Sequence, residues 1–173
     1  MNLDITFLKE KFGKNLIVNE ILSKYSWFNL GGPADIFFRP ENKDQLIEFI
    51  KHIKEKHSEI HILGAGSNTL IRDFGINGVV IKLGSKFSDI KKVNQNIIEA
   101  GAATLDRKVA DFAKTNKISK MEFLACIPGS IGGAVSMNSG CYGSNISEIL
   151  LSIKVLNQRG QEEEIKRDEI KFY

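Results

Sequence analysis

The chain is poor in cysteine, and its apolar runs are short. Only two cysteines occur among 173 residues, Cys126 and Cys141, and their spacing fits neither a zinc site nor a thioredoxin-type redox motif. Such sparing use of cysteine is typical of a reducing compartment, so we expect a cytoplasmic protein. The first residues lack a basic stretch followed by a long apolar run, and no later run reaches membrane-spanning length. We therefore expect neither a secretory signal nor a membrane as partner.

Excess charge is also scarce. The 24 Lys and Arg residues nearly balance the 21 Asp and Glu residues, which leaves a formal charge of +3. Both signs are mixed within short segments such as 51–56 and 162–167, so no basic face for nucleic acid is predicted. The three histidines, His52, His57 and His61, do not share one helical face, and we expect no metal site.

Apolar residues make up 42% of the sequence, enough to bury a core in one domain or two small lobes. A turn at Gly31, Gly32 and Pro33 precedes a strand at 34–39. Asn42 is the predicted N-cap, with Gln45 three residues on, of an amphipathic helix over 43–56. The other predicted elements are an amphipathic segment at 3–12, strands at 60–63, 79–81, 87–93 and 97–100, a helix at 104–116 whose apolar stripe is Leu105, Val109, Phe112 and Ala113, and a hairpin joining 149–156 to 161–165.

The first of two glycine-rich strings is Leu63-Gly64-Ala65-Gly66-Ser67-Asn68. Glycine permits positive φ and removes the Cβ, so successive N–H groups can converge on an anion. Position 69 is Thr instead of the third glycine of a dinucleotide-binding fingerprint, and no Gly-Lys-Ser/Thr follows as in a Walker A loop. Gly75 and the Asn77-Gly78 pair then predict turns. The string therefore links strands, either as a phosphate cradle without a helix dipole or as a plain pair of tight turns.

The second string is Ile127-Pro128-Gly129-Ser130-Ile131-Gly132-Gly133, and small residues continue it to Gly143. Proline and glycine mark turns in many loops, so an ordinary loop is one interpretation. The small residues favour a close approach of the backbone to a ligand. Cys126, just before the string, is either a reactive thiol or a small buried hydrophobe, and Cys141 is open to the same two interpretations.

Four segments in order resemble the UDP-N-acetylenolpyruvoylglucosamine reductase family, flavoenzymes of bacterial cell-wall synthesis. They are residues 27–35 (WFNLGGPAD), 63–73 (LGAGSNTLIRD), 127–133 (IPGSIGG) and 137–143 (MNSGCYG). The resemblance implies an α+β fold, the two-lobed FAD-binding domain of the p-cresol methylhydroxylase and vanillyl-alcohol oxidase type, truncated before the substrate domain. It also implies three parts: an amino-terminal helical segment at 1–26, a first lobe at 27–84 and an incomplete second lobe at 85–173.

The resemblance further implies which residues hold FAD. The first string would cradle the diphosphate, and segments of the second lobe would approach the flavin and its chain. The implied residues are Gly64, Ala65, Gly66, Ser67, Asn68, Thr69, Gly101, Ala102, Pro128, Gly129, Ser130, Ile131, Gly132, Gly133, Asn138 and Tyr142. We expect FAD to be bound non-covalently, because relatives that tether it place histidine or cysteine near the glycine loops, and residues 64–84 contain neither. Cys126 and Cys141 leave a small opening for a tether.

The implied reaction uses NADPH as co-substrate and reduces the enolpyruvyl group of a UDP-sugar to give UDP-N-acetylmuramate. In the family a serine or cysteine of a carboxy-terminal substrate domain donates the proton, helped by a glutamate, and an essential Tyr-Arg pair would begin just past Tyr173. We therefore assign no catalytic residue. The abrupt end at 168–173 suggests a truncated product that is inactive alone and associates through the face left by the missing domain.

Two other functions stay open at this point. One is a sugar or lactone oxidase of the same flavin superfamily, which would use dioxygen, and the other is a non-catalytic or degenerate nucleotide-binding fragment. Two pairs of side chains are equally open. Trp27 and Phe28 either stack on a ring of the cofactor or belong to the core, and Arg72 and Lys82 either steer a diphosphate or are solvated.

Overall fold

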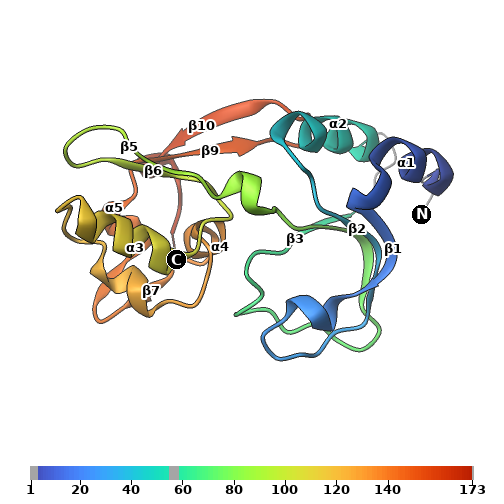
Figure 1. The fold of residues 1–173 in the computed structure, drawn as a ribbon, viewed down its shortest axis with the longest axis horizontal. Coiled ribbons are helices and arrows are strands. Elements are labelled where there is room, and N and C mark those ends of the chain that lie inside the picture. The colour runs from blue at the N-terminus through green and yellow to red at the C-terminus, as the bar shows by residue number, and fades with distance from the viewer. Residues whose placement is uncertain (1–3, 55–58, 173) are drawn as a thin grey trace. The chain divides into compact units, whose positions relative to one another are not determined.

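The computed structural model describes residues 4–54 and 59–172, so His57 and the last two positions of the helix predicted at 43–56 lie outside the described residues. The chain forms two compact units (Figure 1). Unit 1 takes residues 1–84 and 156–161, and unit 2 takes residues 85–155 and 162–173. Within the described ranges, no helix is long and apolar enough to cross a membrane.

Unit 1 is built on a four-stranded sheet with the order β1-β2-β4-β3. Its strands are β1 (Leu16–Ile21), β2 (Pro33–Phe38), β3 (Ile60–Ile62) and β4 (Ile76–Ile81). β1 runs antiparallel to β2, whereas β2, β4 and β3 are parallel. The prediction of a separate helical segment at 1–26 is therefore wrong, because β1 is an edge strand of this sheet.

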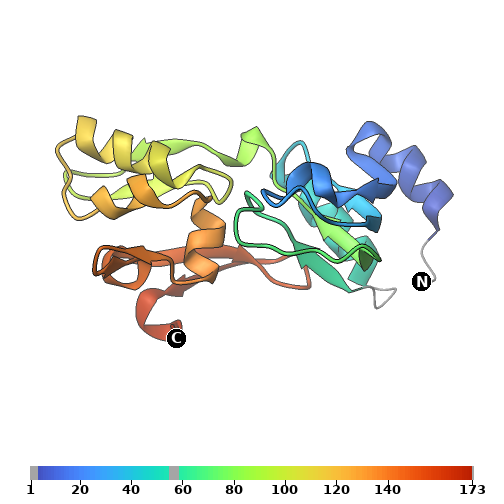
Figure 2. The same cartoon turned by 90° about the horizontal axis from the view of Figure 1, so that it is seen from below.

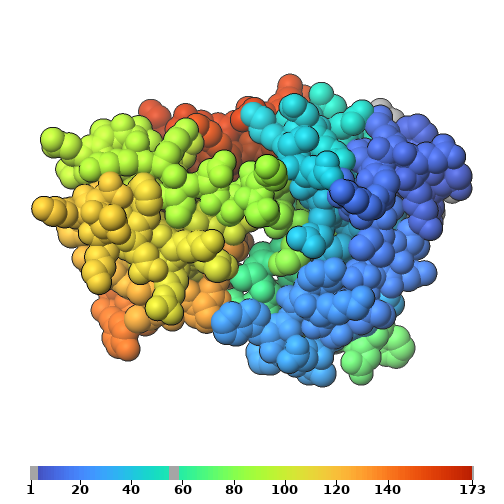
Figure 3. Space-filling view, viewed as in Figure 1, coloured from blue at the N-terminus to red at the C-terminus, as the bar shows by residue number. Residues whose placement is uncertain are grey.

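Helices α1 (Ile5–Phe12) and α2 (Lys43–Lys54) lie beside each other, as the dark blue and cyan surfaces of Figure 3 show. Lys11 Nζ lies 2.7 Å from Glu48 Oε1, and the rings of Phe7 and His52 stack at 4.8 Å. The predicted cap of α2 is confirmed, since Asn42 Oδ1 accepts a hydrogen bond from the Gln45 N–H at 2.9 Å. Buried aromatic rings join both helices to the sheet: Phe12, Phe38 and Phe49.

A second buried cluster of unit 1 forms where the loops 22–32 and 63–75 meet the sheet. Its members come from strands and loops alike: Leu22, Ala34, Phe37, Leu63, Ile71 and Val80. Side chains alternate along a strand, so Phe37 and Val80 belong to this cluster while Phe38 packs with the helices. The loop that carries the first glycine string is thus fixed through Leu63 and Ile71, on either side of it.

Asn77 and Gly78 do not form the predicted turn but lie inside β4. The register between β2 and β4 shifts there, and the Gly78 N–H donates to Asp35 Oδ2 at 3.0 Å. Gly78 has φ +134, and a Cβ would approach the Glu59 carbonyl oxygen to 2.7 Å. Glycine therefore serves a β-bulge here, a use that the sequence pattern does not separate from a turn.

Unit 2 contains three two-stranded hairpins and three short helices. The hairpins pair β5 (Ile90–Lys92) with β6 (Ile98–Ala100), β7 (Gly140–Cys141) with β8 (Ser144–Asn145), and β9 (Ser152–Leu156) with β10 (Glu162–Lys166). The helices are α3 (Asp106–Thr115), α4 (Ile131–Ser136) and α5 (Ile146–Ile149). Figure 2 shows α3 in yellow and the red hairpin β9–β10 as separate layers of this unit.

The core of unit 2 gathers along α3, the 3₁₀ turn Glu122–Cys126 and the short helices after it. Its buried members are Val109, Ala110, Phe123, Leu124, Ala134 and Ile146. Glu99 of β6 ties two hairpins together, because Lys91 Nζ at 2.7 Å and Lys154 Nζ at 3.2 Å both contact its carboxylate. These two lysines lower the pKa of Glu99.

Two predictions for unit 2 need correction. The strand expected at 87–93 covers only β5, because Ser85–Phe87 forms a 3₁₀ turn and the Phe87 carbonyl accepts a hydrogen bond from the Ala103 N–H. The predicted stripe of α3 is confirmed at Val109 and Ala113, which are buried, but it is wrong at its first residue. Leu105 precedes the helix and is 49% exposed, whereas Asp106 is fully buried. Leu105 instead forms an isolated bridge with Ser130, which places the next side chain inside.

Candidate functional site

The first glycine string presents a row of free backbone N–H groups. The Leu63 N–H completes the sheet by donating to the Ile81 carbonyl at 2.9 Å. Across the described residues, no hydrogen-bond acceptor is found for the backbone N–H groups from Gly64 to Asn68. Buried or half-buried N–H groups without an acceptor are rare in folded proteins, and consecutive ones form an anion-binding concavity.

Two carbonyls of this string, those of Gly64 and Gly66, and the Thr69 carbonyl just after it, by contrast, accept hydrogen bonds within the protein. Gly66 O accepts from the Trp27 N–H at 3.0 Å, and Thr69 O accepts from Ser26 Oγ at 3.3 Å. Gly66 has φ +76, and a Cβ there would lie 1.9 Å from the Tyr25 carbonyl oxygen. The contacts with residues 25–27 therefore fix the loop through the Gly66 and Thr69 carbonyls and leave its N–H groups free.

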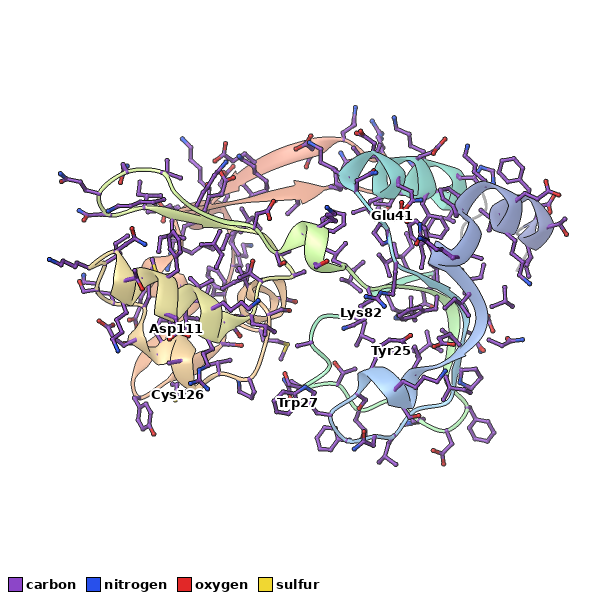
Figure 4. The ribbon with its side chains drawn as sticks, in the orientation of Figure 1. Tyr25, Trp27, Glu41, Lys82, Asp111 and Cys126 are labelled. Carbon is purple, nitrogen blue, oxygen red and sulfur yellow. The ribbon has the colours of Figure 1, made fainter. Side chains whose placement is uncertain are left out.

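Two cations lie at the start of the same string. Lys82 Nζ donates to the Gly64 carbonyl, and Arg39 interacts with Lys82 closely enough to affect its ionisation. Burial, and secondarily the charge of Arg39, lowers the pKa of Lys82. Figure 4 shows Lys82 and Tyr25 on the same part of unit 1. A pocket of about 340 Å³ opens nearby and is lined by Leu63, Thr69 and apolar residues of β3 and β4.

The second glycine string lies wholly in unit 2 and uses most of its N–H groups internally. The Ile131 N–H donates to the Thr104 carbonyl and the Gly132 N–H to the Ala102 carbonyl, both at 2.9 Å. In the described part of the chain, only the Ser130 and Gly133 N–H groups between 129 and 134 lack an acceptor. The string begins a helix, α4, which the sequence analysis did not predict.

A buried acid lies beneath this string. Asp106 is fully buried, and neither carboxylate oxygen has a hydrogen-bond partner among the described residues; Thr104 Oγ1 lacks one as well. A Cβ on Gly129 would come within 2.5 Å of Asp106 Oδ2, so glycine leaves the space that the carboxyl group fills. Burial raises the pKa of Asp106 from 3.8 to about 6.

The other predicted site residues fall into two groups. Gly101 and Ala102 follow β6 and contact the second string through the Gly132–Ala102 hydrogen bond. Asn138 and Tyr142 lie beyond α4, both at positive φ. Asn138 Oδ1 accepts from the Ser147 N–H at 3.0 Å, which gives this side chain a structural role, while Tyr142 is 91% exposed.

Several open interpretations are decided by burial. Trp27 is 62% exposed and Phe28 57% exposed, so the assignment of these rings to the core is wrong. Cys126 is exposed, contrary to a buried-hydrophobe role, whereas Cys141 packs against the core of unit 2. Partial burial and the adjacent Cys126 thiol raise the pKa of Cys141. His52 and His61 lie on α2 and β3, and the described residues hold no group of three metal-ligating side chains.

Sequence reasoning missed Arg39 and Asp106. A cation immediately after a buried strand, as Arg39 follows β2, was the available signal for the first. For Asp106, the signal was a charged residue next to Leu105 of the predicted apolar stripe. This signal can be interpreted only once it is known which residues of the helix face the core.

Comparison with known proteins agrees with this geometry. Residues 34–166 match the FAD binding domain family. A UDP-N-acetylenolpyruvoylglucosamine reductase of Pelagibacter ubique is 51% identical over 140 residues, covering 81% of this chain and 46% of the relative. The enzyme of the same name from Caulobacter sp. is 42% identical over 157 residues, covering 91% of this chain and 51% of its own length.

A solved structure gives the same result. The crystal structure of UDP-N-acetylenolpyruvylglucosamine reductase (MurB) from Thermus caldophilus superposes with a TM-score of 0.74 at 26% identity, covering 91% of this chain and 54% of that one. The chain thus spans about half the length of the curated relatives it matches. The expected α+β fold is confirmed, and this chain belongs to the family of FAD binding domains, in the form that UDP-N-acetylenolpyruvoylglucosamine reductases carry.

Proposed function

We propose that this chain is the FAD-holding part of a cytoplasmic UDP-N-acetylenolpyruvoylglucosamine reductase, which uses NADPH to make UDP-N-acetylmuramate for peptidoglycan. The names of its relatives and its FAD binding domain match support this function. One observation assigns FAD binding to particular residues: the row of free N–H groups from Gly64 to Asn68 in the first string.

The residues present fit a flavin dinucleotide. A diphosphate offers several anionic oxygens, and five consecutive N–H donors at a glycine loop are the kind of partner that such oxygens require. In unit 2, the Ser130 and Gly133 N–H groups are the donors left over for the cofactor. A Cβ on Gly133 would meet only Ser130 Oγ, at 3.6 Å, so the protein's own packing does not require glycine there.

When bound, FAD would supply hydride transfer from NADPH to the carbon–carbon double bond of the UDP-sugar. The residues of this chain bind and orient the cofactor. The first string holds the diphosphate through its N–H groups, while Gly101, Ala102 and residues 128–133 offer a backbone surface without bulky side chains. Asn138 and Tyr142 contribute less, since Asn138 is engaged by Ser147. Binding is non-covalent, in line with the absence of histidine and cysteine from residues 64–84.

We further propose that this chain alone does not turn over the substrate. It spans about half the length of its relatives, and the sequence analysis assigns it no catalytic residue. The UDP-sugar would meet groups supplied from outside these residues. Association through the face that such a partner segment covers is part of the same proposal.

The test is an absorption spectrum of the purified chain after incubation with FAD and desalting. Retained flavin bands that are released on denaturation support the proposal. Bands that remain with the denatured protein contradict it in favour of a tethered flavin, and a folded but colourless chain contradicts FAD binding. NADPH oxidation with the UDP-sugar should stay at background, and clear turnover would contradict the expected inactivity.

A further inference from the structure

Two cations of unit 1 are brought together by strand register. In the parallel sheet Phe38 pairs with Ile81, and Ile62 pairs with Ile81 from the other side. The next residues along these strands are Arg39, Lys82 and Leu63, so both cations and the start of the first string share the carboxyl edge of the sheet. This edge is where ligands bind in open parallel sheets.

The alternation of side chains fixes which face the cations occupy. Phe37 and Val80 belong to the cluster on the loop side of the sheet, and Arg39 and Lys82 lie two positions further along the same strands. They therefore point to the side on which the first string and Tyr25 lie. Lys82 does contact this string, through the hydrogen bond from Nζ to the Gly64 carbonyl.

Neither cation is neutralised by an acid. In the two described ranges, no carboxylate lies within ion-pair distance of Lys82 or Arg39. The Glu20 carboxylate, which accepts from Tyr25 Oη at 2.9 Å, is already paired with Lys24 Nζ at 3.2 Å. Two like charges held together, one of them half-buried, repel each other, and an anion between them relieves that repulsion.

We propose that Arg39 and Lys82 form the cationic side of a diphosphate site whose other side is the row of N–H groups from Gly64 to Asn68. The inference rests on the proposed function, because the diphosphate meant is that of FAD. Lys82 compensates charge and braces Gly64, while Arg39, whose side chain has no hydrogen bond of its own within the described structure, is free to bind phosphate oxygens.

The test compares FAD affinity, measured by flavin fluorescence, across variants of the full chain. Arg39→Gln and Lys82→Gln should each weaken FAD binding on the order of tenfold, because a hydrogen bond to a charged group is lost. Lys82→Arg should bind within about threefold of the unmodified chain, since it keeps the charge. Lys54→Gln is the matched control, because Lys54 is an exposed cation at the end of α2 and belongs to neither the first string nor the carboxyl edge of the sheet.

A melting curve for each variant checks that it is folded. If Lys82→Gln does not fold, the proposal is tested by Arg39→Gln alone. FAD affinity that is unchanged in Arg39→Gln, or that falls equally in Lys54→Gln, overturns the proposal. Binding of the fluorescent diphosphate mant-ADP separates this proposal from the proposed function. A chain that retains no FAD but binds mant-ADP, and loses it in Arg39→Gln, keeps the diphosphate site and rejects the flavoprotein. An unmodified chain that binds neither FAD nor mant-ADP rejects both proposals.

Discussion

The two glycine strings look alike in sequence, but they differ in which N–H groups are free and in why glycine is needed. In the first, Gly66 is demanded by the protein itself, since a Cβ would lie 1.9 Å from the Tyr25 carbonyl oxygen, while the N–H groups remain free. In the second, most N–H groups are used internally, and although Gly129 leaves space for the Asp106 carboxylate, a Cβ on Gly133 would meet only Ser130 Oγ. A glycine-rich loop therefore shows its function only after the glycines needed for backbone packing are separated from those that leave space.

The difference between the two strings is tested most directly by adding one methyl group to a glycine of each. Gly66→Ala should cost on the order of 4 kcal/mol of unfolding free energy, combining left-handed backbone strain with an overlap against Tyr25. Gly133→Ala lies in α4 and should leave stability unchanged or raise it by about 1 kcal/mol, because alanine favours a helix. Urea unfolding of both variants measures the difference.

FAD titration of the folded Gly133→Ala chain adds the second half of this test. Its affinity should fall if the cofactor needs the open space above that residue. Equal stability losses for Gly66→Ala and Gly133→Ala would show that the two strings do not differ in the way described.

Among the residues that the structure describes, the buried acid under the second string has no counterpart under the first, and it predicts a pH dependence. Burial raises the pKa of Asp106 in the folded chain from 3.8 to about 6. The folded state then binds more protons than the unfolded state between these values, so stability falls as pH rises from about 4 to 6 and levels off above. The full loss is about 3 kcal/mol.

Asp106→Asn should remove this slope and stabilise the protein at pH 7, as measured by urea unfolding from pH 4 to 8. Asp111→Asn, on the exposed side of the same helix, is the control and should keep the slope. A flat profile in the unmodified chain would mean that water or a neighbouring group already satisfies the Asp106 carboxylate.

The two thiols next to the second string offer a smaller, chemical contrast. Cys126 is exposed, whereas Cys141 packs against the core and its pKa is raised by partial burial and by Cys126. Because the thiolate is the reactive form, iodoacetamide should label Cys126 roughly tenfold faster than Cys141 at pH 7.5. Mass spectrometry of timed samples gives both rates, and a urea-unfolded sample should show them converging. Faster labelling of Cys141 in the folded chain would contradict its placement.

Salt should produce the smallest effect, and only through the first string. If Arg39 and Lys82 face the diphosphate, raising the ionic strength from 0.05 to 0.5 M should weaken FAD binding roughly threefold, because exposed charges are screened. Fluorescence titration at several salt concentrations measures this, and the Arg39→Gln chain should respond less. Salt-independent binding would limit recognition of the cofactor to the N–H groups.

Local patterns predicted much of the fold and the location of the strings. The cap at Asn42, the helices near 43–56 and 104–116, and the carboxy-terminal hairpin were recognisable because periodicity and turn residues act over a few positions. The burial of Asp106 at the start of α3 was not recognisable, since the bridge from Leu105 to Ser130 that places it joins residues distant in sequence. Arg39 meets Lys82 only through strand pairing, so no local pattern marks that pair.

The hairpin between β9 and β10 determines when unit 1 can finish folding during synthesis. Its tip, residues 156–161, belongs to unit 1, where a Cβ added to Gly160 would lie within 3.3 Å of Ile47 and Lys51. Unit 1 therefore cannot complete its contacts until residue 161 has left the ribosome, by which time most of unit 2 has been translated. A protein cut between the units at residue 84 would lack this tip, so the chain cannot be divided into its two units by one cut.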